Sequence, residues 1–223
     1  MQKKTSRLQS WFGVQDMTVG RPMDSLVRFS IPLLVGNLAQ QLYNTVDSIV
    51  VGQYIGDTAL AAVGTAGPIL NLLLVLFMGI ATGASILSAQ YFGAHDRQHL
   101  SRVVGASILL TVSSSILMGF VGFFSSPWLM SLVNPPADVL DGAVIYLQII
   151  FIGILGTATY NILAGVLRGL GDSLMPLVSL LVASLLNIVL DIVFVRDLRM
   201  GVAGVAWATI IAQAISGTMC LVR

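Results

Sequence analysis

The sequence predicts an all-α membrane protein with six transmembrane helices, on the evidence of its composition and the length of its apolar segments. Of the 223 residues, 56% are hydrophobic and only 9% are charged, whereas soluble domains carry roughly 25% charged residues. A membrane-spanning helix needs roughly 20 predominantly apolar residues, and segments of that kind recur along the chain. We expect spans at about 29–51, 58–88, 103–124, 142–167, 174–195 and 202–222.

The charge balance and the cysteine content exclude several other classes. The net charge is +1, so no strong field is available to recruit nucleic acid. Cys220 is the only cysteine, which rules out an intrachain disulfide. Residues 1–28 hold no continuous apolar run, so we expect a basic cytoplasmic tail rather than a cleavable signal peptide.

The first span carries a polar stripe that cannot face lipid. The segment from Phe29 to Gly52 reads FSIPLLVGNLAQQLYNTVDSIVVG. Its polar residues step by three and four positions, which stacks them on one face of a helix. Amides and a carboxylate are costly in hydrocarbon, so this face should meet other helices or a watery cavity. The stripe comprises Asn37, Gln40, Gln41, Asn44, Asp47 and Ser48.

Proline and polar residues delimit the remaining spans. Pro68 should bend the second span, and the polar segment 90–102 should form a loop. Pro135 and Pro136 rule out a continuous helix across the connection 125–141. Arg168 to Asp172 is expected to form a short turn before the fifth span.

The distribution of Lys and Arg predicts that both ends of the chain are cytoplasmic, because cytoplasmic loops carry an excess of these residues. With the amino terminus inside, nine of the 11 basic residues are cytoplasmic, and Arg196 and Arg199 are outside. The inner set is Lys3, Lys4, Arg7, Arg21, Arg28, Arg97, Arg102, Arg168 and Arg223.

Two intramembrane carboxylates are the strongest candidates for a functional site. Asp47 in the first span and Asp191 in the fifth each lie four residues before the expected outer end of their helix, or about 6 Å deep at ~1.5 Å per residue. Asn187 shares a face with Asp191, and Thr209 of the sixth span lies near the same level. Their oxygens suit a hard cation such as sodium, and a proton is an equally suitable ligand for two desolvated carboxylates. The alternative is a static network that only fixes helix packing.

Other motifs are weaker. His95 and His99 have the spacing of metal ligands on a helix, but they fall in a polar loop without a third ligand. The fourth span carries polar residues that could line a cavity or simply pack against neighbouring helices: Tyr146, Thr157, Tyr160 and Asn161. No nucleophile and base have a plausible meeting place, so an enzyme and a bound cofactor are not expected.

Three ordered motifs carry a resemblance to a known family. They are the segment from Asp16 into the second span, LRGLGDSLMP at 167–176, and NIVLD followed by GVAGVAWAT. With these, almost the whole chain resembles the amino-terminal half of multidrug and toxic compound extrusion (MATE) transporters. The resemblance implies one six-helix lobe of a two-lobe transporter, with the second lobe absent from this chain.

The resemblance also implies a function and a set of site residues. It suggests an antiporter of the inner (plasma) membrane, driven by sodium or protons, that exports drugs or organic cations. It assigns cation coupling to Asp47, Asn187, Asp191 and Thr209, with sodium at the last three. It places Gln40 and Tyr146 on the cavity wall, and the polar stripe of the first span adds Asn37 and Asn44 to that wall. The expected partners are the lipid bilayer and a second lobe or a second copy.

The sequence is compatible with two other functions. One is a lipid-linked sugar flippase of the same superfamily, although a pyrophosphate should require basic residues within the spans and none is expected there. The other is a non-transporting membrane scaffold subunit, which would not need paired carboxylates.

Overall fold

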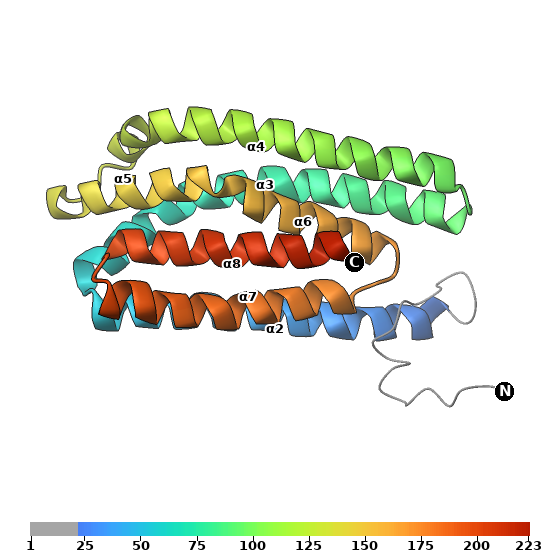
Figure 1. Ribbon diagram of the computed structural model, residues 1–223, viewed down its shortest axis with the longest axis horizontal. Helices are drawn as coiled ribbons and strands as arrows, with labels where there is room; N and C mark the ends of the chain where they lie inside the picture. Colours follow the sequence, from blue (N-terminus) through green and yellow to red (C-terminus); the bar gives the residue numbers. More distant parts are fainter. Residues whose placement is uncertain (1–21) are drawn as a thin grey trace.

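The computed structural model describes residues 22–223, which fold into helices joined by short connections (Figure 1). Within α2, the side chains of residues 22–29, 32, 33, 39 and 43 also lie outside the described part. The elements are α2 (Pro22–Tyr54), α3 (Asp57–Gly93), α4 (Arg97–Val133), α5 (Ala137–Ile152), α6 (Ile154–Gly169), α7 (Leu174–Asp191), η1 (Ile192–Asp197) and α8 (Val202–Val222).

The helices extend further than the sequence predicted. Residues 1–21 of the expected tail lie outside the described part, but residues 22–28 are already helical. The loop expected at 90–102 shrinks to 94–96, and the connection expected at 125–141 shrinks to 134–136. Since α3 and α4 each have 37 residues, they are about 55 Å long, against a hydrocarbon core of about 30 Å. Hydropathy detects only the part inside the core, while the helices continue beyond it.

The fourth predicted span, 142–167, is two helices that meet at Gly153. α5 and α6 are bent by 53° relative to one another at this break. Gly153 lies so close to Ile210 of α8 that a β-carbon there would overlap the isoleucine side chain. Close approach of α8 therefore requires glycine at the bend.

The described helices include four, or up to five, candidates for the six membrane spans that the composition predicted. α3, α4, the continuous pair α7–η1, and α8 are each long and apolar enough to cross a membrane, and the bent pair α5–α6 adds a further span if it crosses as one. α2 falls outside that group because its polar stripe makes it the least apolar of these helices.

The helices lie roughly parallel in one elongated bundle (Figure 1). α2 packs mainly along α7, α8 lies between α7 and α6, and α3 packs against α5 and α6. α4 is outermost, and Leu109, Leu117 and Phe120 project from it, each more than 60% exposed. The beginning of α2, the α3–α4 connection, the α6–α7 turn and the end of α8 share one end of the bundle (Figure 1).

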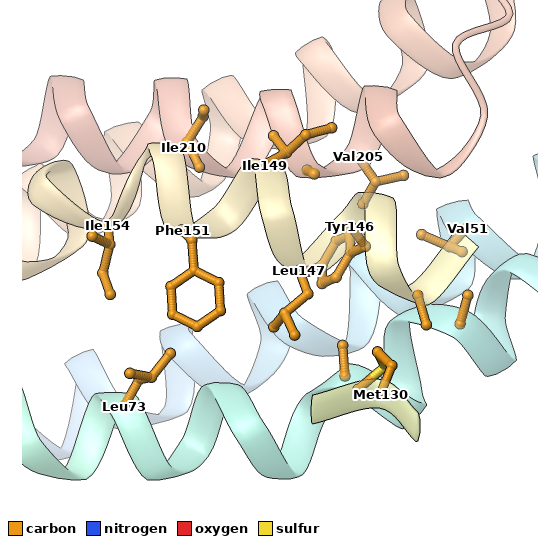
Figure 2. Packing of buried hydrophobic residues seen from close by; sticks show 14 of the residues in the cluster. Val51, Leu73, Met130, Tyr146, Leu147, Ile149, Phe151, Ile154, Val205 and Ile210 are labelled. Atoms are coloured by element: carbon orange, nitrogen blue, oxygen red, sulfur yellow. The ribbon is translucent and has the colours of Figure 1, made fainter. Parts of the chain in front are cut away.

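The core lies between α5 and its neighbours. Tyr146, Leu147 and Phe151 of α5 are at most 5% exposed, and they point among side chains of α3, α4 and α8 (Figure 2). Val51, near the end of α2, joins the same cluster (Figure 2). This cluster fixes the half of the bundle into which α2 carries Asp47.

Close packing of α6 on α3 yields a stability prediction. A β-carbon at Gly165 would lie 2.7 Å from the backbone oxygen of Ala81, whereas one at Gly83 would meet nothing within 4 Å. Gly165→Ala should therefore be less stable than the Gly83→Ala control by about 1–3 kcal/mol, because overpacking must displace backbone. Thermal unfolding in detergent, followed by circular dichroism, measures the difference. Equal unfolding temperatures for the two variants would contradict the packing described here.

Candidate functional site

The four predicted coupling residues meet where α2, α7 and α8 come together. Asp47 comes from α2, Asn187 and Asp191 from the last two turns of α7, and Thr209 from α8. Asn187 and Asp191 are 0% exposed, and Asp47 is half-buried. We refer to these four residues as the carboxylate junction.

Asn187 connects the two sides of the junction. In the carboxamide orientation that satisfies both of its ends, Nδ2 donates to Asp191 Oδ2 at 3.1 Å. Its oxygen then accepts from the backbone N–H of Thr209 at 3.2 Å. The Thr209 hydroxyl donates to the carbonyl of Val205 at 3.0 Å. One buried amide therefore links the carboxylate of α7 to the backbone of α8.

The carboxyl groups of Asp47 and Asp191 lie next to each other between α2 and α7. Such a contact is attractive only when one carboxyl is protonated, because two carboxylates have no hydrogen to share. Oδ1 of Asp47 and Oδ1 of Asp191 are buried without a hydrogen-bond partner in the described part of the chain. The junction therefore offers free oxygens to a proton or to a hard cation.

The shared depth of the carboxylates persists although their helices end later than predicted. α2 runs to Tyr54, and α7 continues through η1 to Asp197. Both carboxylates thus lie roughly 10 Å from the end of their helix, not about 6 Å. η1 is a π-helical segment that begins immediately after Asp191, and such segments are frequent at functional sites. Nothing in the apolar run around Asp191 signals this change of helix type.

A cavity of ≈ 590 Å³ opens beside the junction, within the size range of ligand pockets. Asp47 and Thr209 reach its wall, whereas Asn187 and Asp191 lie behind it. The four residues expected to line a cavity all lie on this wall: Asn37, Gln40, Asn44 and Tyr146. Asn37 and Asn44 are exposed, while Tyr146 is buried.

Polar residues of α6 and α8 also line the wall. Thr157 and Asn161, for which the sequence left open cavity lining or helix packing, line it from α6, and Gln213 lines it from α8. Arg168, which was expected in a turn, lines it from the last turn of α6. Arg168 corrects the expectation that no basic residue faces the interior of the spans. The spacing of Thr157, Asn161, Gly165 and Arg168 by four, four and three was the signal in the sequence, because it places them on one helical face.

The histidines at 95 and 99 belong to a helix cap. Asp96 accepts from the backbone N–H of His99 at 3.1 Å, and its other oxygen lies 2.6 Å from the His99 ring Nδ1. The backbone hydrogen bond, followed by the ring contact, lowers the pKa of Asp96. No cluster of three or more His, Cys, Asp or Glu side chains suited to a metal occurs between residues 22 and 223.

Together, these features define a polytopic helical membrane protein with a polar cavity inside its bundle. The MatE family model matches residues 32–193. The chain is 36% identical over 201 residues to the probable multidrug resistance protein YpnP of Bacillus subtilis, covering 90% of this chain and 45% of that protein.

Solved structures give the same result. A structure described as the outward-facing conformation of a multidrug resistance MATE family transporter matches with a TM-score of 0.84 at 28% identity, over 98% of this chain and 47% of that one. A crystal structure of MATE in complex with MaD5 matches with a TM-score of 0.87 at 29% identity, over 99% of this chain and 48% of that one.

The chain therefore belongs to the MatE family of transporters, as its motifs predicted. It spans about half the length of the relatives it matches. Its fold is that of one half of a MATE transporter, and the family consists of transporters rather than enzymes.

The buried amide yields a second stability prediction. Asn187→Ala removes the donor to Asp191 and leaves a buried carboxylate oxygen without a partner, at a cost of about 1–3 kcal/mol in unfolding free energy. Ser184→Ala, one turn earlier and only half-buried, is the control and should change stability by less than about 0.5 kcal/mol. Chemical unfolding in detergent distinguishes the two. A smaller loss for Asn187→Ala than for the control would contradict the hydrogen bonds described here.

Proposed function

We propose that this chain supplies the cation-coupling lobe of a MATE-type antiporter that exports drugs or other xenobiotics. The observation that carries the proposal is the carboxylate junction beside the cavity, with two facing carboxyls from different helices. An arrangement that served packing alone would gain little from two buried acids, because intramembrane charges are costly. Membership of a transporter family supports the same conclusion.

The coupling ion, sodium or a proton, binds at the junction in this proposal. Sodium is held at Asp191, Asn187 and Thr209, and a proton is held between Asp47 and Asp191. The orphaned Oδ1 atoms of the two aspartates fit either ion. Binding of either ion removes the repulsion between the two carboxylates, and loss of the ion restores it.

A change of charge at the junction acts first on α2. This helix packs mainly on α7 and has few contacts with α3, so α7 is the neighbour that determines its position. Repulsion between Asp47 and Asp191 therefore weakens the main contact that holds α2. α2 also carries Asn37, Gln40 and Asn44 along the cavity wall, and its movement changes the space available to a drug.

The protein lies in the plasma membrane with both ends of this chain cytoplasmic in this proposal. The bundle end that contains Arg97, Arg102, Arg168 and Arg223 is the cytoplasmic one, in keeping with the positive-inside rule. Arg196, within η1, and Arg199, in the connection that follows it, lie at the opposite end and are exceptions to this rule.

The cavity wall is completed by a partner, either a second six-helix lobe or a second copy of this chain. Asn37, Gln41 and Asn44 are exposed on α2, and exposure of amides to lipid is costly. Transporters of this general type move one lobe against another around a central site.

The two competing functions make different demands. A flippase for lipid-linked sugars must hold a pyrophosphate, and Arg168 is the single basic residue on the described cavity wall, which is little charge for that ligand. A scaffold subunit should tolerate Asp47→Asn and Asp191→Asn together, whereas an antiporter should not.

Asp191→Asn tests the ion site directly on the purified chain. Sodium at ten times its dissociation constant should stabilise the native chain by about 1.4 kcal/mol, because it binds only the folded state. The variant should lose this gain, while Asp141→Asn, exposed on α5, should keep it. Thermal unfolding in sodium chloride against choline chloride provides the measurement.

The same pair of variants separates coupling from scaffolding. When the chain is coexpressed with a matching second lobe, Asp191→Asn should reduce gradient-driven drug efflux to background with normal membrane insertion, and Asp141→Asn should not. Normal efflux by the Asp47→Asn, Asp191→Asn double variant would refute the antiporter proposal.

A cysteine at Asn44 tests the partner surface. With Cys220 replaced by serine, Asn44→Cys should form a disulfide-linked dimer of the chain under mild oxidation, because the exposed amide face then packs on a second copy. Leu117→Cys on the opposite, lipid-facing helix α4 should remain monomeric. Coexpression of a matching second lobe should abolish the dimer by covering the face. A monomer for both variants, unchanged by the second lobe, would remove the evidence for a shared wall.

A further inference from the structure

The cavity has opposite charges at its two ends. Asp47 is the acid on its wall and Arg168 is the base. Arg168 ends α6 at the level of Ser85, because Gly169 packs directly on the Ser85 backbone oxygen. Asp47 faces Asp191, which lies roughly 22 Å further along α7 than Pro176 at the Arg168 end. The charges are therefore too far apart to neutralise each other.

Arg168 also lacks an acidic partner nearby. Asp172, one turn further on, pairs with Arg223, whose Nε donates to Oδ2 at 3.2 Å. Oδ1 of Asp172 accepts from the backbone N–H of Met175 at 3.1 Å. Both oxygens of Asp172 are thus engaged. Among the described residues, no ion pair involves Arg168, and this half-buried residue lines the cavity.

The amino terminus of α7 begins shortly after Arg168 in the chain. Ser173 precedes this 18-residue helix, lines the cavity, and makes no hydrogen bond to cap the helix with its side chain. The carboxylate of Asp172 caps the helix instead, because it accepts from the backbone N–H of Met175, so the negative charge favoured at this helix end is already present. The attraction for a phosphate therefore comes from Arg168, and the Ser173 hydroxyl can add a hydrogen bond.

The wall beyond this end is mixed. α2 and α6 contribute the polar residues already described, and α3 and α7 contribute an apolar strip, which we call the apolar wall. This strip is made of Leu73, Leu74, Phe77, Met78, Leu177 and Leu180. From Ser85 to Leu73, α3 covers about 18 Å, close to the ~15 Å that one leaflet contributes to the hydrocarbon core. The basic end and the apolar wall of the cavity therefore follow one another in the same order as the phosphate and the acyl chain of a phospholipid.

We propose that the cavity binds an anionic phospholipid of the cytoplasmic leaflet, with its phosphate at Arg168 and Ser173 and an acyl chain along the apolar wall. The inference rests on the orientation given with the proposed function, which places Arg168 at the cytoplasmic surface. A drug entering the cavity then competes with this lipid for the wall that contains Phe77 and Leu177.

The test measures lipid retained by the full chain. Native mass spectrometry of the chain, with phosphatidylglycerol or phosphatidylcholine added, reports the number and affinity of bound lipids. Arg168→Gln should bind phosphatidylglycerol roughly tenfold more weakly, as loss of a charge-assisted contact to phosphate predicts. Arg168→Lys should retain most of the binding, and Arg97→Gln, exposed at the same end of the bundle, should bind as the native chain does.

Further arms identify the ligand and keep the outcome separate from transport. Ser173→Ala should weaken phosphatidylglycerol binding in the same direction, which covers the case of an Arg168→Gln chain that fails to fold. Inorganic phosphate should not displace the lipid, because the acyl chain contributes to binding; displacement would show that the site takes soluble phosphate instead. Asp191→Asn should leave lipid binding unchanged, so loss of ion coupling cannot mimic a failure here. Equal lipid binding by Arg168→Gln, Arg97→Gln and the native chain would overturn the proposal.

Discussion

Two carboxyl groups held against each other inside a helical bundle are the constraint on which the rest of this structure depends. Asp47 and Asp191 come from helices far apart in the sequence, and each leaves one buried oxygen without a hydrogen-bond partner among the residues that the structure describes. Only a proton or a cation makes their contact attractive. Asn187 joins the pair to α8. A change of charge at the junction therefore acts on the contacts of α2, α7 and α8 together. The apolar cluster around Tyr146 and Phe151 fixes the surrounding half of the bundle (Figure 2).

The sequence placed Asp47 and Asp191 at a common depth although it ended both helices too early. The predicted ends of the first and fifth spans fall three and two residues short of the ends of α2 and η1, and these similar errors nearly cancel. The helix ends themselves were wrong, since hydropathy registers the hydrocarbon core and α3 and α4 extend well beyond it. The bend at Gly153 depends on how closely Ile210 approaches, and a tertiary contact of that kind leaves no periodic pattern in the sequence.

Arg168 lines the cavity although the sequence did not predict it there, and the reason differs from that for the helix ends. The motif LRGLGD was assigned to a turn, and a basic residue in a turn at the membrane surface normally faces water. The residue instead ends α6, on the face that Thr157 and Asn161 already present to the cavity. The helical spacing of Thr157 and Asn161 continues past the end of the predicted span to Arg168. This spacing was the evidence in the sequence that Arg168 shares their face. The π-helical segment after Asp191 left no comparable signal.

The separation of charge within the cavity limits what can occupy it. A cationic drug is drawn toward Asp47 only while that carboxyl is ionised, and a proton or sodium at the junction removes the attraction. Arg168 cannot take over this role, because it repels cations and lies roughly 22 Å away along the bundle. In the two proposals, a lipid phosphate at Arg168 and a drug cation near Asp47 therefore do not compete for charge. The two ligands would compete for the apolar wall between, so a drug would displace the acyl chain by filling that wall and not by replacing the headgroup.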